Sequence, residues 1–156
     1  MSAAARTLAL LGLLGLMELG CDRRPALAPD AEIRVYGEQG VLLVAPEDPR
    51  GAALLAEARA LLAAARPGAG ALDRRGVALA LARGALEFRF AHAQRFATAA
   101  GDSLTAWRLL IVLGMEPRPP GGEEGLLLLV GSPDYETRPH VTARPRGRLV
   151  AILEGR

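Results

Sequence analysis

Lysine is missing from this chain, and cysteine, serine and histidine are scarce. Without lysine the protein can form no Schiff base and no Gly-Lys-Ser/Thr phosphate loop. Its one cysteine, Cys21, rules out an intrachain disulfide and a zinc site of several thiolates. The serines beyond Cys21 are Ser103 and Ser132, the histidines are His92 and His140, and none lies in a Gly-x-Ser-x-Gly or His-Glu-x-x-His motif. The familiar hydrolase signatures are therefore excluded.

Charge is nearly balanced, with 19 basic residues, all arginine, against 17 acidic ones and a formal net charge of +2. Near the C-terminus, however, only Glu154 stands among five arginines. These are Arg138, Arg144, Arg146, Arg148 and Arg156. The pattern is typical of a solvated, charge-protected edge. The alternative is a surface that orients the molecule on anionic headgroups or anionic envelope polymers. An envelope protein is a further possible partner. Nucleic acid is not an expected partner, because no aromatic residues are interleaved with these arginines.

The N-terminal segment has the pattern of an export signal. Arg6 is followed by an uncharged run over residues 7–17, which is shorter than the roughly 20 apolar residues of a membrane-spanning helix but long enough for a signal peptide. The run leads to Leu19-Gly20-Cys21. In these residues the chain resembles a bacterial lipoprotein precursor. The resemblance implies cleavage before Cys21, a diacylglyceryl group on its thiol, and anchoring in the cell envelope, on the periplasmic face or at the cell surface.

We therefore expect a signal peptide over residues 1–20, a tether over 21–30 and a single globular domain over 31–156. The tether contains two prolines and four charged residues, which is typical of an extended connection. The remaining length suits one domain with a sizeable core. No cofactor is expected.

Two segments at the start of the domain have clear patterns. Residues 33–36 alternate between apolar and polar, and an apolar run over 41–45 follows Gly-Glu-Gln-Gly, which predicts a β-hairpin with a four-residue loop. Asp48 can cap a helix that starts at Pro49. Apolar residues then recur at helical spacing on one face, so we expect this helix to run to about Arg66.

The middle of the domain is ambiguous, because apolar residues between 72 and 100 fit both strand and helix periods. We favour strands first and then a helix over 91–100, followed by a helix over 104–114, a loop over 115–125 and strands over 126–130 and 148–153. The predicted fold is α+β, with a β-hairpin, two to three helices and C-terminal strands. A mostly α-helical repeat is the alternative. Trp107, Phe88, Phe90, Phe96 and His92 are expected to pack in the core.

The best candidate for chemistry is the loop over residues 132–140, which follows a predicted strand. Asp134, Glu136 and His140 could supply ligands or an acid/base pair, although their spacing matches no specific metal motif and Ser-Pro-Asp is typical of an ordinary turn. The leading hypothesis is a membrane-anchored envelope lipoprotein with an accessory, binding or structural role and no catalysis. One alternative is an exported metal- or carboxylate-assisted hydrolase that uses the 132–140 loop, and another is a helical-repeat interaction module.

Overall fold

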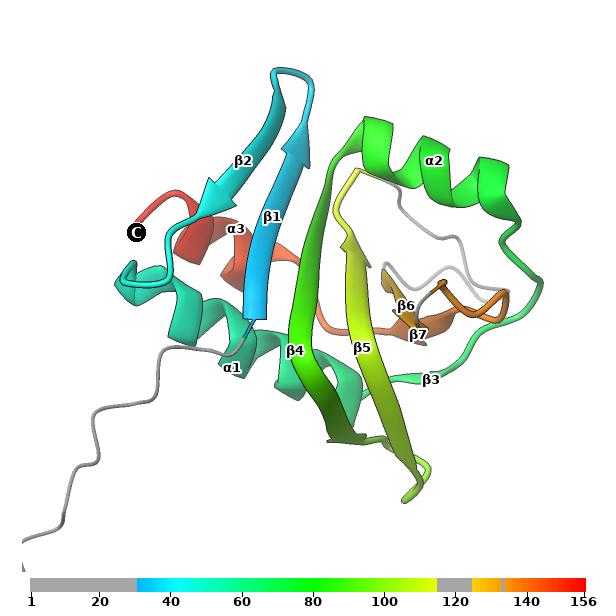
Figure 1. Cartoon of the computed structure of the whole chain (residues 1–156). Helices are drawn as coiled ribbons and strands as arrows, with labels where there is room; N and C mark the ends of the chain where they lie inside the picture. The colour runs from blue at the N-terminus through cyan, green and yellow to red at the C-terminus, as the bar shows by residue number, and fades with distance from the viewer. Residues whose placement is uncertain (1–30, 115–124, 133) are drawn as a thin grey trace, which may run out of the picture.

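The computed structural model describes residues 31–114, 125–132 and 134–156. They form one antiparallel sheet with three helices (Figure 1). The strands are β1 (Ala31–Gly37), β2 (Gly40–Val44), β3 (Arg66–Pro67), β4 (Ala85–Ala97), β5 (Ser103–Val112), β6 (Leu126–Gly131) and β7 (His140–Thr142). The helices are α1 (Pro49–Ala63), α2 (Arg74–Arg83) and α3 (Gly147–Leu153). The strand order is β2-β1-β4-β5-β6-β7-β3, and the predicted α+β class is confirmed. Cys21, the predicted signal peptide and tether, and residues 115–124 of the predicted loop lie outside the described residues.

The predicted hairpin is confirmed as β1 and β2. Ile33 pairs with Val44 and Gly37 pairs with Gly40, so the turn holds two residues and not four. Gly40 has φ of +110°, a conformation that side-chain-bearing residues rarely adopt. The glycine therefore makes the tight turn possible.

The helix predicted from Asp48 and Pro49 is confirmed as α1. The Asp48 carboxylate accepts a hydrogen bond from the backbone N–H of Arg50 at 2.9 Å, as an N-cap does. Proline fits the first turn because its missing N–H has no helical partner there. The helix ends at Ala63, earlier than predicted, and the chain then enters β3 beside β7.

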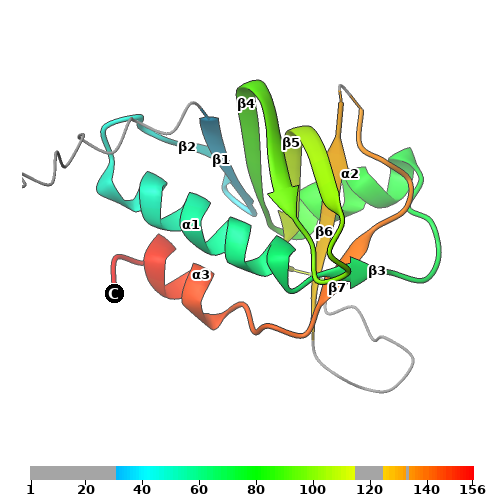
Figure 2. The same ribbon diagram turned by 90° about the horizontal axis from the view of Figure 1, so that it is seen from below.

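One face of the sheet is covered by α1 and α3, which lie side by side (Figure 2). Alternate residues of the central strands point toward these helices. The largest fully buried members are Ile33, Leu86, Phe88, Leu109, Ile111 and Leu128 from the sheet with Leu54, Leu61, Leu62 and Leu149 from the helices. Each such side chain contributes about 1.5–3 kcal/mol relative to an exposed one. This cluster is the main core.

The opposite face is only partly covered, by α2 at one end (Figure 1). There Ala80 packs on Val112 and Leu127, and Val77 and Leu81 pack beside Leu110. The rest of this face carries polar side chains on β1, β4 and β5, and the exposed apolar residues Val41 and Leu43 on the edge strand β2. None of the three helices within the described residues is long and apolar enough to span a bilayer.

Two predictions between residues 72 and 100 are wrong. Of the strands expected before residue 91, the run over residues 86–90 is confirmed as the first half of β4. The run before it is instead the helix α2, capped by Asp73, whose carboxylate accepts from Gly76 N–H at 2.8 Å. The predicted helix over 91–100 is instead the far half of strand β4, which pairs with β5 up to Ala97↔Ser103. Pairing with a neighbouring strand overrides the weak strand propensity of alanine.

The predictions for residues 104–114 and 148–153 are also wrong, because the expected helix is a strand and the expected strand is a helix. The first is β5, a strand buried on both faces near its end, whose continuous apolar run also fits a helical period. The second is α3, which buries Leu149 against the core. The strand predicted over 126–130 is confirmed as β6. Strands β4 and β5 overturn the helical-repeat alternative, since a repeat needs helix throughout that region.

Candidate functional site

A buried carboxylate, Glu87, lies on the face of the sheet that α2 partly covers, among the polar side chains of that face. In β4 it alternates with Leu86 and Phe88, which point to the α1 side, so Glu87 points to the α2 side. Its side chain is 1% exposed. A buried charge requires partners, because desolvation otherwise disfavours the ionised form.

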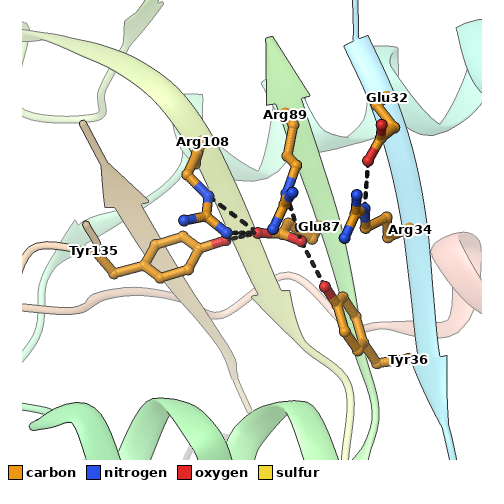
Figure 3. A network of polar contacts seen from close by, with 7 residues as sticks. All are labelled: Glu32, Arg34, Tyr36, Glu87, Arg89, Arg108 and Tyr135. Atoms are coloured by element: carbon orange, nitrogen blue, oxygen red, sulfur yellow. Dashed lines mark hydrogen bonds and ion pairs between the residues drawn. The ribbon is translucent and has the colours of Figure 1, made fainter. Parts of the chain in front are cut away.

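Both carboxylate oxygens of Glu87 are fully engaged (Figure 3). Oε1 accepts from the Tyr135 hydroxyl at 2.5 Å and from Arg108 Nη2 and Nε at 2.6 and 3.1 Å. Oε2 accepts from the Tyr36 hydroxyl at 2.7 Å and from Arg89 Nε at 3.2 Å. The two phenols approach from opposite sides, one from β1 and one from the segment after β6. The carboxylate is thus held by two charged and two neutral donors.

Arg89 and Arg108 are direct cross-strand partners on β4 and β5. Like charges in that position repel each other unless an anion lies between them, and Glu87 supplies it. Further along the same face, Arg34 pairs with Glu32 on β1. Three guanidinium groups therefore face two carboxylates, so the group keeps one excess positive charge.

The pKa values reflect this arrangement. Burial alone would raise the pKa of Glu87, but hydrogen bonds from Tyr135, Tyr36 and Arg108 outweigh it and hold the pKa below the ordinary value. Burial and the bond to Glu87 raise the pKa of Tyr135 far above the usual range of a phenol, and they raise the pKa of Tyr36 as well. Glu87 is therefore ionised at neutral pH and both tyrosines are protonated.

Gly131 explains how Tyr135 reaches the site. The two residues form an isolated antiparallel bridge, so the chain folds back on itself directly after β6. A Cβ at Gly131 would lie 2.3 Å from the Asp134 carbonyl oxygen and 2.8 Å from Tyr135 Cα. Only glycine fits this close approach. The Arg108 guanidinium then lies over the Tyr135 ring, 4.9 Å from its centroid.

A pocket of about 550 Å³ lies beside this cluster, lined by Arg89, Phe90, Trp107, Arg108 and Ser132. It coincides with an irregularity in the sheet. Between the pairs Arg89↔Arg108 and Gln94↔Ala106, β4 has four residues where β5 has only Trp107. Bulges of this kind redirect side chains. Trp107 is 43% exposed, and the prediction that it packs in the core is wrong.

The structure brings the residues predicted as a site together only in part, because Glu136 lies near His140 but the three do not form a metal-binding group among the described residues. Asp134 and Glu136 are exposed, whereas His140 is buried in β7 and its Nδ1 has no hydrogen-bond partner among the described residues. Burial lowers the pKa of His140, and nearby Glu136 offsets this in part. In the described part of the chain, no three His, Cys, Asp or Glu side chains form a group that could hold a metal ion.

The basic C-terminal segment is partly neutralised. Glu57 of α1 is 5% exposed and pairs with Arg148 at 3.1 Å and with Arg144 at 3.8 Å. Arg146 donates to the Leu113 carbonyl at 2.7 Å, and Arg156 pairs with Glu154. Arg144, Arg146 and Arg148 therefore attach the C-terminal segment to α1 and to Leu113, the residue after β5.

The sequence contained one usable signal for the Glu87 cluster. Glu87 and Arg89 alternate with apolar residues, which places two opposite charges on one face of a strand. His92, in contrast, is exposed on β4 and does not pack between aromatic rings. Comparison with protein-family models, with curated proteins and with solved structures finds no match.

Proposed function

We propose that this chain is a non-catalytic lipoprotein of the bacterial cell envelope, anchored to a membrane through acylated Cys21 and serving an accessory binding role. The N-terminal pattern that ends in Leu19-Gly20-Cys21 supports the anchor. One structural observation supports the absence of catalysis. In the part of the chain that the structure describes, the two buried carboxylates, Glu57 and Glu87, are each paired with two arginines.

A general acid or base needs a pKa near the working pH and an open path to substrate. Glu87 has neither property, because its pKa is depressed and its oxygens are occupied by protein donors. Neither described serine hydroxyl is bonded to a histidine, and Ser103 instead accepts from Arg95 at 2.8 Å. These contacts favour structural and binding roles.

The anchor and the residues after it limit the distance between the membrane and the globular domain. Acyl chains contribute about 0.8 kcal/mol per buried CH₂, and two or more chains give durable attachment. Residues 21–30 separate the cysteine from β1. Ten residues can span at most about 35 Å, so the domain works close to the bilayer surface.

The experiment is expression of the full chain in a bacterial host, followed by membrane fractionation and mass spectrometry of the N-terminal fragment. We expect the wild-type fragment to begin at Cys21 with acyl mass added, and Cys21→Ser to leave the membrane fraction. Met17→Leu, which alters the same segment and keeps the thiol, should stay membrane-bound. An unmodified wild-type cysteine, or equal partitioning of Cys21→Ser, contradicts the proposal.

A further inference from the structure

We propose that the pocket beside the Glu87 cluster binds a small monoanionic carboxylate carried on a flat apolar ring. The same opening is lined by two guanidinium groups, Arg89 and Arg108, and by two aromatic residues, Trp107 and Phe90. The site does not depend on the lipid anchor. The acylation experiment and the binding experiment can therefore fail separately.

Arg89 is the group that receives the carboxylate. It bonds to Glu87 through Nε only, and its terminal nitrogens Nη1 and Nη2 donate to no described residue. Its side chain is 38% exposed and lines the pocket. A guanidinium edge with two parallel N–H groups matches the two oxygens of a carboxylate.

Local charge sets the charge of the ligand. Within the cluster formed by the described residues Glu32, Arg34, Glu87, Arg89 and Arg108, the guanidinium groups outnumber the carboxylates by one. A monoanion restores neutrality, whereas a cation meets repulsion. Because Glu87 fixes the Arg89 Nε, the guanidinium is held in place before the ligand arrives, which lowers the entropy cost of binding.

Trp107 selects the rest of the ligand, because it is 43% exposed, whereas Phe90 is buried against Phe88 and Phe96 and only closes the floor of the pocket. An exposed indole next to a guanidinium offers a flat apolar surface for ring stacking. The volume of about 550 Å³ lies within the usual range of small-molecule sites. Acetate, which lacks a ring, should therefore bind less well than benzoate.

Trp107 also reports on the site, since it is the only tryptophan in the chain. We would titrate the full chain in detergent with benzoate and follow the Trp107 fluorescence and its single indole N–H signal in NMR spectra. We expect saturable changes with benzoate and binding at least about tenfold weaker with acetate and with uncharged benzamide, because a charge-assisted pair contributes at least a factor of ten.

Arg89→Gln should weaken benzoate binding at least about tenfold, while its unliganded Trp107 spectrum and unfolding midpoint confirm that the variant is folded. The matched control is Arg95→Gln, which removes the same charge from the same strand at a residue that pairs with Ser103 and does not line the pocket. Its affinity should stay within about twofold of wild type. Absence of saturation with benzoate, unchanged affinity in Arg89→Gln, or an equal loss in Arg95→Gln overturns the proposal.

Discussion

Arg89 and Arg108 stand opposite each other on adjacent strands, and both donate to the same carboxylate, Glu87. The anion converts a repulsive cross-strand pair into an ion cluster that ties β4 to β5. Tyr36 and Tyr135 extend the cluster to β1 and to the segment after β6. One buried acidic residue thereby joins four parts of the chain.

Removal of the central charge should destabilise the fold. Glu87→Gln keeps the side-chain shape but leaves two guanidinium groups without their anion. Loss of one member of a buried ion pair costs about 3–5 kcal/mol, and we expect the lower part of that range because Arg89 and Arg108 are partly exposed. Urea unfolding measures the change. Glu32→Gln, at a carboxylate that is half exposed, is the control and should cost less than about 1 kcal/mol.

The same carboxylate predicts a dependence on pH. The pKa of Glu87 is lower in the folded state than its ordinary value of 4.5. Its stabilising contribution is therefore complete above the unfolded-state pKa and is lost as the pH falls through the folded-state pKa. The difference in unfolding free energy between wild type and Glu87→Gln should be constant near neutrality and shrink below about pH 4.5. A difference that stays constant into strong acid would contradict this assignment.

The N-cap of α1 can be tested on its own. Asp48→Ala removes the acceptor for Arg50 N–H and should lower the unfolding free energy by about 0.5–2 kcal/mol. Asp48→Ser keeps a capping oxygen and should recover most of the loss. Asp102→Ala serves as a control because only the Asp102 backbone makes a hydrogen bond. An equal effect in both alanine variants argues against capping as the cause.

Gly131→Ala should disturb the segment that brings Tyr135 to Glu87. The new Cβ meets backbone atoms at 2.3 and 2.8 Å, so the loop must move, at a cost of about 1–3 kcal/mol. Gly147→Ala is the matched control, since nothing lies within 4 Å of its added Cβ and the residue is helical. Thermal unfolding of both variants is the measurement. A tolerated Gly131→Ala would show that the close approach can relax.

The sequence predicted those elements whose local signals agree with one another. Asp48, Pro49 and a one-sided apolar stripe all indicate a helix, and α1 follows. In α2 the Val-Ala-Leu-Ala-Leu alternation suggests a strand, while the cap at Asp73 indicates the helix that forms. In β4 the decisive information lies in its partners β1 and β5, which a local pattern does not contain.

The site was harder to predict than the fold. Alternation placed Glu87 and Arg89 on one face, but Arg108 fell in a segment expected to be helical, and Tyr135 lay in a loop considered for its acidic neighbours. Tyr135 and Arg108 reach Glu87 across sequence separations of 48 and 21 residues. Contacts of that kind depend on strand register, which the composition and spacing of single segments do not specify.

Helix α1 has one further consequence. It joins β2 to β3, and these strands form the two opposite borders of the sheet. A helix of 15 residues is about 22 Å long, close to the width of roughly 29 Å across seven strands. The helix therefore couples the two edge strands. Neither β2 nor β3 can separate from the sheet without displacing α1 from the strands between them. Unfolding of the domain should accordingly be cooperative, with β2 and β3 detaching from the sheet in the same step.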